Sequence, residues 1–145
     1  MNRRSRALPA TRASPAAARQ LVRAAIADAG IAVDPDAAAL ATSEIVANVV
    51  QHAHTAMRLE VAVGDTVRVT VTDTRPDLPV PTSLDPDAAL ATRGRGLQLV
   101  DRLSSRWGLF GDRDSKTVWF EIEPAAAGPR GAPAHAGGDA ASSVR

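Results

Sequence analysis

The stretch "SEIVANVVQHA", residues 43–53, decides the fold. Ile45 and Val49 belong to an apolar stripe at helical spacing, which predicts an amphipathic helix with one buried face. Glu44 and Asn48 stand one helical turn apart on the other side. Asparagine is a poor residue for a helix interior, because its amide competes for backbone hydrogen bonds. The pair therefore calls for an explanation outside the helix itself.

Two helices are predicted in the first third of the chain. Ser14 and Pro15 are a capping residue and a proline at the first helical position, and Gly30 marks the end of that helix. Asp34 and Pro35 repeat the same start signal for the helix that contains residues 43–53.

Strand patterns follow in two pairs. Residues 57–73 alternate apolar and polar side chains on both sides of Gly64-Asp65, which predicts an antiparallel hairpin. Residues 106–124 read as a second hairpin, and residues 94–108 begin as a glycine turn followed by a helix. Residues 74–93 contain four prolines without a sustained period, which predicts a functional lid. This order predicts an α+β fold: a two-layer α/β sandwich with a mainly antiparallel sheet and helices on one face.

Composition limits the other possibilities. The 145 residues include no cysteine, which excludes disulfides and thiolate chemistry and favours a cytoplasmic location without a membrane span. Residues 1–13 carry four arginines and no acid, so we expect a flexible basic arm; residues 124–145 are rich in Ala, Gly and Pro, so we expect a disordered tail. The remaining domain, 14–123, has a net charge of −4 within the chain's total of +1, which argues against direct nucleic-acid binding.

Several polar features together indicate a nucleotide site. Glycines before a helix, as in Gly94–Gly96, let backbone N–H groups approach phosphates, and Arg95 adds a cation. Asn48 offers an oxygen ligand for Mg²⁺, Glu44 a base, and Asp73 an acceptor for the adenine amino group. Each feature alone also fits an ordinary polar helix face, a turn cap or a loop.

Four segments in this order resemble a known superfamily. The segments "EIVANVVQHA", "VTVTD", "GRGLQLVD" and "KTVWFEI" resemble the ATP-binding domain of the GHKL superfamily, which has the Bergerat fold. The resemblance covers roughly residues 15–123. The motifs "NVVQHA" and "GRGLQLVD" most resemble those of one branch, the anti-sigma-factor serine/threonine kinases and their actinobacterial relatives.

The resemblance implies specific roles for residues at matching positions. Asn48 matches the magnesium-coordinating asparagine, and Asp73 matches the adenine-binding aspartate. Glu44 matches the glutamate that acts as general base or positions the nucleophile. The phosphate-binding glycine box corresponds to Gly94, Arg95, Gly96 and Leu97, and the threonine near the aspartate corresponds to Thr117. Thr117 alone would be read as an ordinary strand residue. One departure is the sequence "DTRPDLP" after Asp73, where many members have glycines.

The implied function is that of a Mg-ATP-dependent regulatory kinase. It would phosphorylate a serine or threonine of an anti-anti-sigma protein, with a sigma factor as a further partner, and the relatives act as homodimers. A non-catalytic nucleotide-sensing module that switches a partner-binding surface is the alternative. A DNA-associated regulator that uses its arginine-rich arm is a third interpretation, which the acidic domain disfavours.

Overall fold

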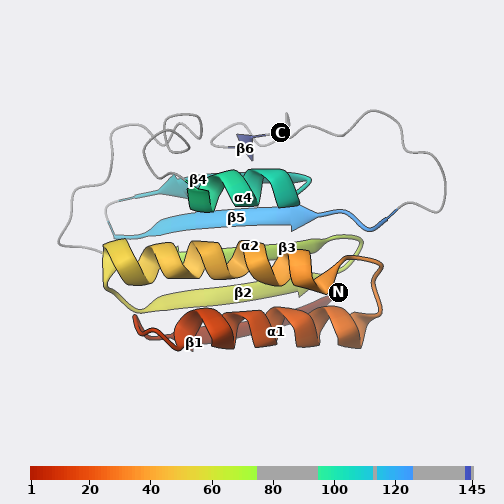
Figure 1. The fold of residues 1–145 in the computed structure, drawn as a ribbon, viewed down its shortest axis with the longest axis horizontal. Coiled ribbons are helices and arrows are strands. Elements are labelled where there is room, and N and C mark those ends of the chain that lie inside the picture. Colours follow the sequence, from red (N-terminus) through yellow and green to blue (C-terminus); the bar gives the residue numbers. More distant parts are fainter. Residues whose placement is uncertain (75–94, 113, 126–142, 145) are drawn as a thin grey trace.

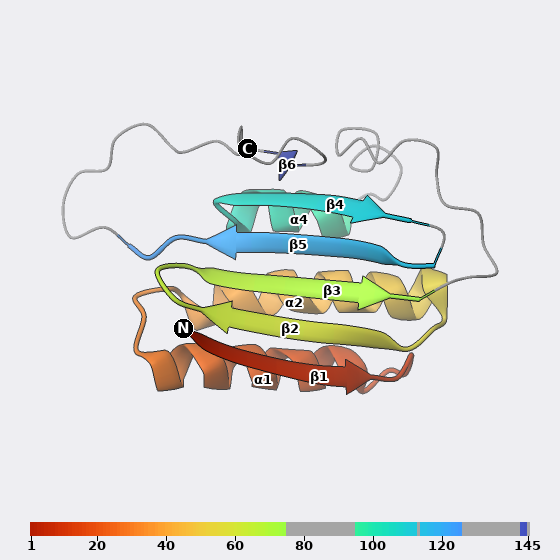
Figure 2. The ribbon, with the colours of Figure 1, turned by 180° about the vertical axis from the view of Figure 1, so that it is seen from behind.

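The computed structural model describes residues 1–74, 95–112, 114–125 and 143–144. The predicted lid therefore lies outside the described residues except for Thr74, and so does most of the predicted tail. The predicted α+β sandwich is confirmed in the described part. Helices α1 (Ser14–Ala29), α2 (Pro35–Asn48) and α4 (Arg95–Leu103) cover one face of the sheet (Figure 1). Among the described residues, no helix covers the other face (Figure 2).

The sheet is antiparallel between all neighbouring strands, in the order β1-β2-β3-β5-β4-β6. Its strands are β1 (Asn2–Leu8), β2 (Met57–Val63), β3 (Val67–Asp73), β4 (Arg106–Gly111), β5 (Lys116–Ile122) and the two-residue β6 (Ser143–Val144). The two predicted hairpins are β2–β3 and β4–β5, as the sequence indicated.

The core lies between the sheet and the helices. Alternation in β3 buries Val67, Val69 and Val71 on the helix side, and the predicted stripe of α2 meets them with Ile45, which is 2% exposed. Residues on the apolar face of α4 are also buried, as predicted, with Val100 at 0% exposure. The alternating pattern thus fixes which side of each strand faces the helices.

The starts of the helices follow the predicted signals only in part. The Asp34 side chain accepts a hydrogen bond from the Asp36 backbone N–H (2.9 Å), as expected for a cap. Ser14 does not cap α1, because its hydroxyl donates to the Pro9 carbonyl and Ala13 occupies the cap position. Gly30 ends α1 in the left-handed conformation (φ 67°), and its N–H donates to the carbonyls of Ile26 and Ala27.

The N-terminal arm differs from the expectation of a flexible segment. Residues 2–8 form β1, which pairs with β2 over its whole length. Leu8 is 2% exposed in the core, and Arg4 forms an ion pair with Asp28 of α1. Charge counting missed this strand, because "NRRSRAL" lacks the alternation of apolar and polar residues that predicts a strand. The strand is held by backbone pairing with β2. Within the tail, Ser143 and Val144 pair with Gly108 and Trp107 of β4.

Candidate functional site

Glu44 and Asn48 lie on one face of α2, one turn apart, near the end of that helix. Both side chains are half-buried. Within the described residues, neither the Glu44 carboxylate nor the Asn48 amide has a hydrogen-bond partner. Two half-buried polar groups on the same face, with their hydrogen-bonding capacity unused there, are suited to a bound ligand.

The backbone changes immediately after Asn48. Residues Val49–Ala53 form a π-helical turn, η1, which ends at His54 in the left-handed conformation (φ 54°). The His54 N–H donates to the Val49 carbonyl at 3.0 Å. Such wide turns inside helices occur frequently at functional sites. One signal in the sequence accompanies this turn: the chain must leave the helix between residues 53 and 57, yet no glycine or proline marks the end there.

Asp73 is the last residue of β3, and it lies at the same end of the molecule as the end of α2. Its side chain faces the helix layer and is 2% exposed. Asp73 pairs with Met57, the first residue of β2, which follows η1 after only three residues. A bond from the Thr55 hydroxyl to the Thr74 carbonyl (2.7 Å) further ties the loop after η1 to the end of β3.

The glycine-box helix begins at this same end (Figure 1). α4 leads into β4 at the opposite end of the sheet, so its first residue, Arg95, lies at the end where β3 finishes. Gly94 lies outside the described residues, and only the backbone of Arg95 and Gly96 is described. Leu97 is 3% exposed and packs in the core, so it anchors the first turn of the helix.

Thr117 lies at this end too, but on the other face of the sheet. It pairs with Thr72, and the two hydroxyls are 3.0 Å apart. Neighbouring residues of a strand point to opposite faces, so Thr117 points away from Asp73. The predicted role beside the aspartate does not fit this geometry, because the side chains of Thr117 and Asp73 lie on opposite faces of the sheet. The sequence alone could not reveal this, since the position of a residue along its strand does not determine the register with the next strand. We therefore leave Thr117 out of the candidate site.

The remaining groups have the chemistry that Mg²⁺ and a nucleotide require. Among the described residues, no cluster of three His, Cys, Asp or Glu side chains could hold a metal on its own. A single amide oxygen from Asn48 suits Mg²⁺, which keeps several waters and takes further oxygens from substrate phosphates. The N-terminus of α4 faces the same end and carries the partial positive charge that favours an anion.

Comparison with known proteins identifies the family. The sequence model of the histidine kinase-like ATPase domain matches residues 8–121. The chain belongs to this family. The resemblance to the GHKL superfamily is thereby confirmed, and the matched range contains Glu44, Asn48 and Asp73.

Solved structures agree on the fold of this histidine kinase-like ATPase domain. The chain is similar to a crystal structure of the RsbU and RsbW domains of Rv1364c from Mycobacterium tuberculosis, with a TM-score of 0.62 and 20% identity. The match covers 85% of this chain and 32% of that chain. This chain therefore spans about a third of the length of that crystallised chain. No curated protein matches the sequence. Within the described residues, no helix is long and apolar enough to cross a membrane.

Proposed function

We propose that this ATPase-family domain is a Mg-ATP-dependent regulatory kinase of the anti-sigma type. The observation that carries the proposal is the convergence at one end of the sheet: the Glu44–Asn48 face of α2, the buried Asp73, and the start of α4. These elements come from three separated segments, and each supplies a group suited to a different part of Mg-ATP. The RsbW domain named in the similar structure supports the choice of the anti-sigma branch.

Each residue has a defined task in this proposal. The Asn48 amide oxygen holds Mg²⁺, the Asp73 carboxylate accepts a hydrogen bond from the adenine amino group, and the first turn of α4 faces the phosphates. When bound, Mg²⁺ neutralises charge on the phosphate oxygens. Together these residues would hold the phosphates of ATP near Asn48 and its adenine near Asp73.

Phosphoryl transfer then needs one acid–base group from this chain. The hydroxyl oxygen of a partner serine or threonine forms the new bond to the γ-phosphorus, and the bond from that phosphorus to the β–γ bridging oxygen breaks. Glu44 accepts the hydroxyl proton, and ADP leaves with the electron pair of the broken bond. The substrate is an anti-anti-sigma protein, with a sigma factor as a second partner of the same cycle.

The alternative is a nucleotide-sensing module without turnover. One observation favours it: no described residue hydrogen-bonds the Glu44 carboxylate, whereas a catalytic base is usually oriented by a second group. In that case ATP binding would alter a partner-binding surface, and Glu44 would only contribute to binding.

Labelled ATP separates these two functions. The chain is incubated with γ-labelled Mg-ATP and a candidate anti-anti-sigma protein, and the label on the partner is measured for wild type, Glu44→Gln and Glu60→Gln. Glu60 is a matched control, because it lies on β2 away from the site. The kinase predicts label on the partner that Glu44→Gln abolishes and Glu60→Gln leaves intact. ATP binding without any label on the partner would support the sensor and contradict the kinase.

A further inference from the structure

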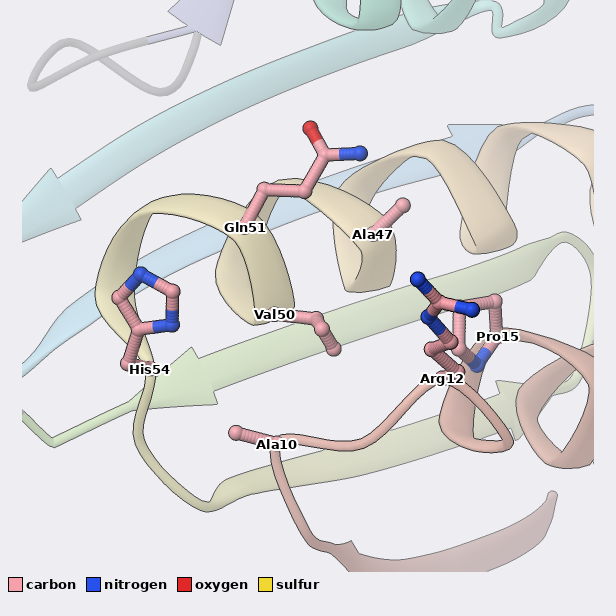
Figure 3. Close-up of a pocket in the computed structure, with 7 residues that line it drawn as sticks. All are labelled: Ala10, Arg12, Pro15, Ala47, Val50, Gln51 and His54. Carbon is pink, nitrogen blue, oxygen red and sulfur yellow. The ribbon is translucent and has the colours of Figure 1, made fainter.

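A hollow lies on the opposite flank of α2 from α4. It has a volume of about 760 Å³ and opens between the loop before α1 and the end of α2 (Figure 3). Its walls include Arg12 from the loop before α1, Pro15 from the first turn of α1, and four residues around the end of α2: Ala47, Val50, Gln51 and His54. That volume lies within the range of small-molecule sites in proteins.

Helical spacing places this hollow beside the Glu44–Asn48 face of α2. Ala47, Val50 and Gln51 line it from α2 and its π turn, and His54 follows that turn. Val50 follows Asn48 by two positions and is rotated by about 200° from it, whereas Gln51 follows Asn48 by three positions and borders its face. Among the described residues, the hollow takes its other walls from the α1 side and none from β3 or α4. A ligand against Val50 and the α1 side would therefore leave the Asn48 face accessible.

The polar side chains of the hollow favour an anion. Arg12, Gln51 and His54 are exposed, and no acidic residue belongs to its described lining. In the part of the chain that the structure describes, none of these three side chains forms a hydrogen bond or an ion pair. A guanidinium, an amide N–H and an imidazole can all donate hydrogen bonds to an anionic group.

The rest of the lining is apolar. Val50 and Ala47 are half-buried on the helix side, and Pro15 is half-buried on the α1 side. Figure 3 shows the Arg12 guanidinium beside Pro15 and facing the Val50 side of α2. A phosphate ion alone would leave these apolar surfaces in water, whereas a ligand with an apolar body would cover them.

We propose that this hollow binds a small organic anion, with Arg12 at the anionic group and the apolar body against Val50 and Pro15. The site goes beyond the proposed kinase function, and it does not depend on that function. The proposal predicts the class of ligand, an apolar molecule that carries one phosphate, carboxylate or sulfonate. It also predicts that ATP does not compete with this ligand for binding.

The probe for this proposal is 8-anilinonaphthalene-1-sulfonate, an aromatic sulfonate whose fluorescence rises in apolar surroundings. The full chain is titrated with it, and the same titration with uncharged N-phenyl-1-naphthylamine provides the matched probe without the anion. We expect saturable binding of the sulfonate, weakened about tenfold by Arg12→Gln, because one charge-assisted hydrogen bond contributes roughly 1.5 kcal/mol. Binding of the uncharged probe should not change with Arg12→Gln.

A control variant makes the outcome specific. Arg6→Gln removes an exposed arginine on β1 and should leave both titrations unchanged. Circular dichroism confirms that each variant is folded. An affinity that Arg12→Gln and Arg6→Gln affect equally, or displacement of the sulfonate by saturating Mg-ATP, would overturn the proposal.

Discussion

Replacing Asp73 by Asn should remove recognition of adenine while leaving recognition of the triphosphate intact. Asp73 is 2% exposed at the end of β3, so a hydrogen bond from the adenine amino group would be made away from water. Hydrogen bonds to charged groups in proteins contribute about 1.5–3 kcal/mol. This range corresponds to a loss of about 10- to 150-fold in ATP affinity.

The assay compares two ligands by calorimetry in the presence of Mg²⁺. Wild type, Asp73→Asn and Asp65→Asn are each titrated with ATP and with inorganic tripolyphosphate, which lacks the base. Asp65 is an exposed aspartate in the turn between β2 and β3, at the opposite end of β3, and it should behave like wild type. Equal losses of ATP and tripolyphosphate affinity in Asp73→Asn, or no loss of either, would refute the reasoning.

Three further predictions concern the framework. Ile45→Ala should lower the free energy of unfolding by about 2–5 kcal/mol in a urea titration, because truncating a side chain that is only 2% exposed leaves a cavity in the core. Leu40→Ala, at an exposed position, should lower the free energy of unfolding far less. Glu121→Gln weakens the ion pairs with Arg68 (2.9 Å) and Arg106 (2.5 Å) and should lower the free energy of unfolding by about 1–3 kcal/mol in the same titration. Glu60→Gln affects only an exposed pair with Arg3 at 3.9 Å and should leave the free energy of unfolding almost unchanged. Backbone hydrogen bonds from residues 114 and 115 lower the pKa of Asp112, so the NMR signal of its carboxyl carbon should titrate below the ordinary aspartate range. The stabilising effect of these hydrogen bonds should be present above the ordinary range and lost as the pH falls through the lowered pKa. A titration midpoint in the ordinary range would contradict this prediction.

The sequence was sufficient for features that depend on local pattern. Alternation around Gly64-Asp65 predicted a hairpin and its buried side, and the Asp34-Pro35 signal predicted the start of α2. These features could be predicted because each residue's neighbours along the chain determine them.

Features that depend on distant partners could not be predicted in the same way. β1 exists because β2 offers an edge more than fifty residues away in sequence, as the pairing of Asn2 with Val63 shows. The face on which Thr117 lies depends on its register with β3. Ser14 was a plausible cap, but the Pro9 carbonyl competed for its hydroxyl. The π turn after Asn48 likewise depends on how the chain must enter β2.

The most direct test of the central claim is calorimetric titration of ATP with and without Mg²⁺, on wild type and on Asn48→Ala. The account predicts that Mg²⁺ strengthens ATP binding to wild type and that most of this magnesium-dependent gain is lost in Asn48→Ala, with the fold intact by circular dichroism. The same dependence on magnesium in both proteins, or no binding of ATP to wild type, would contradict it.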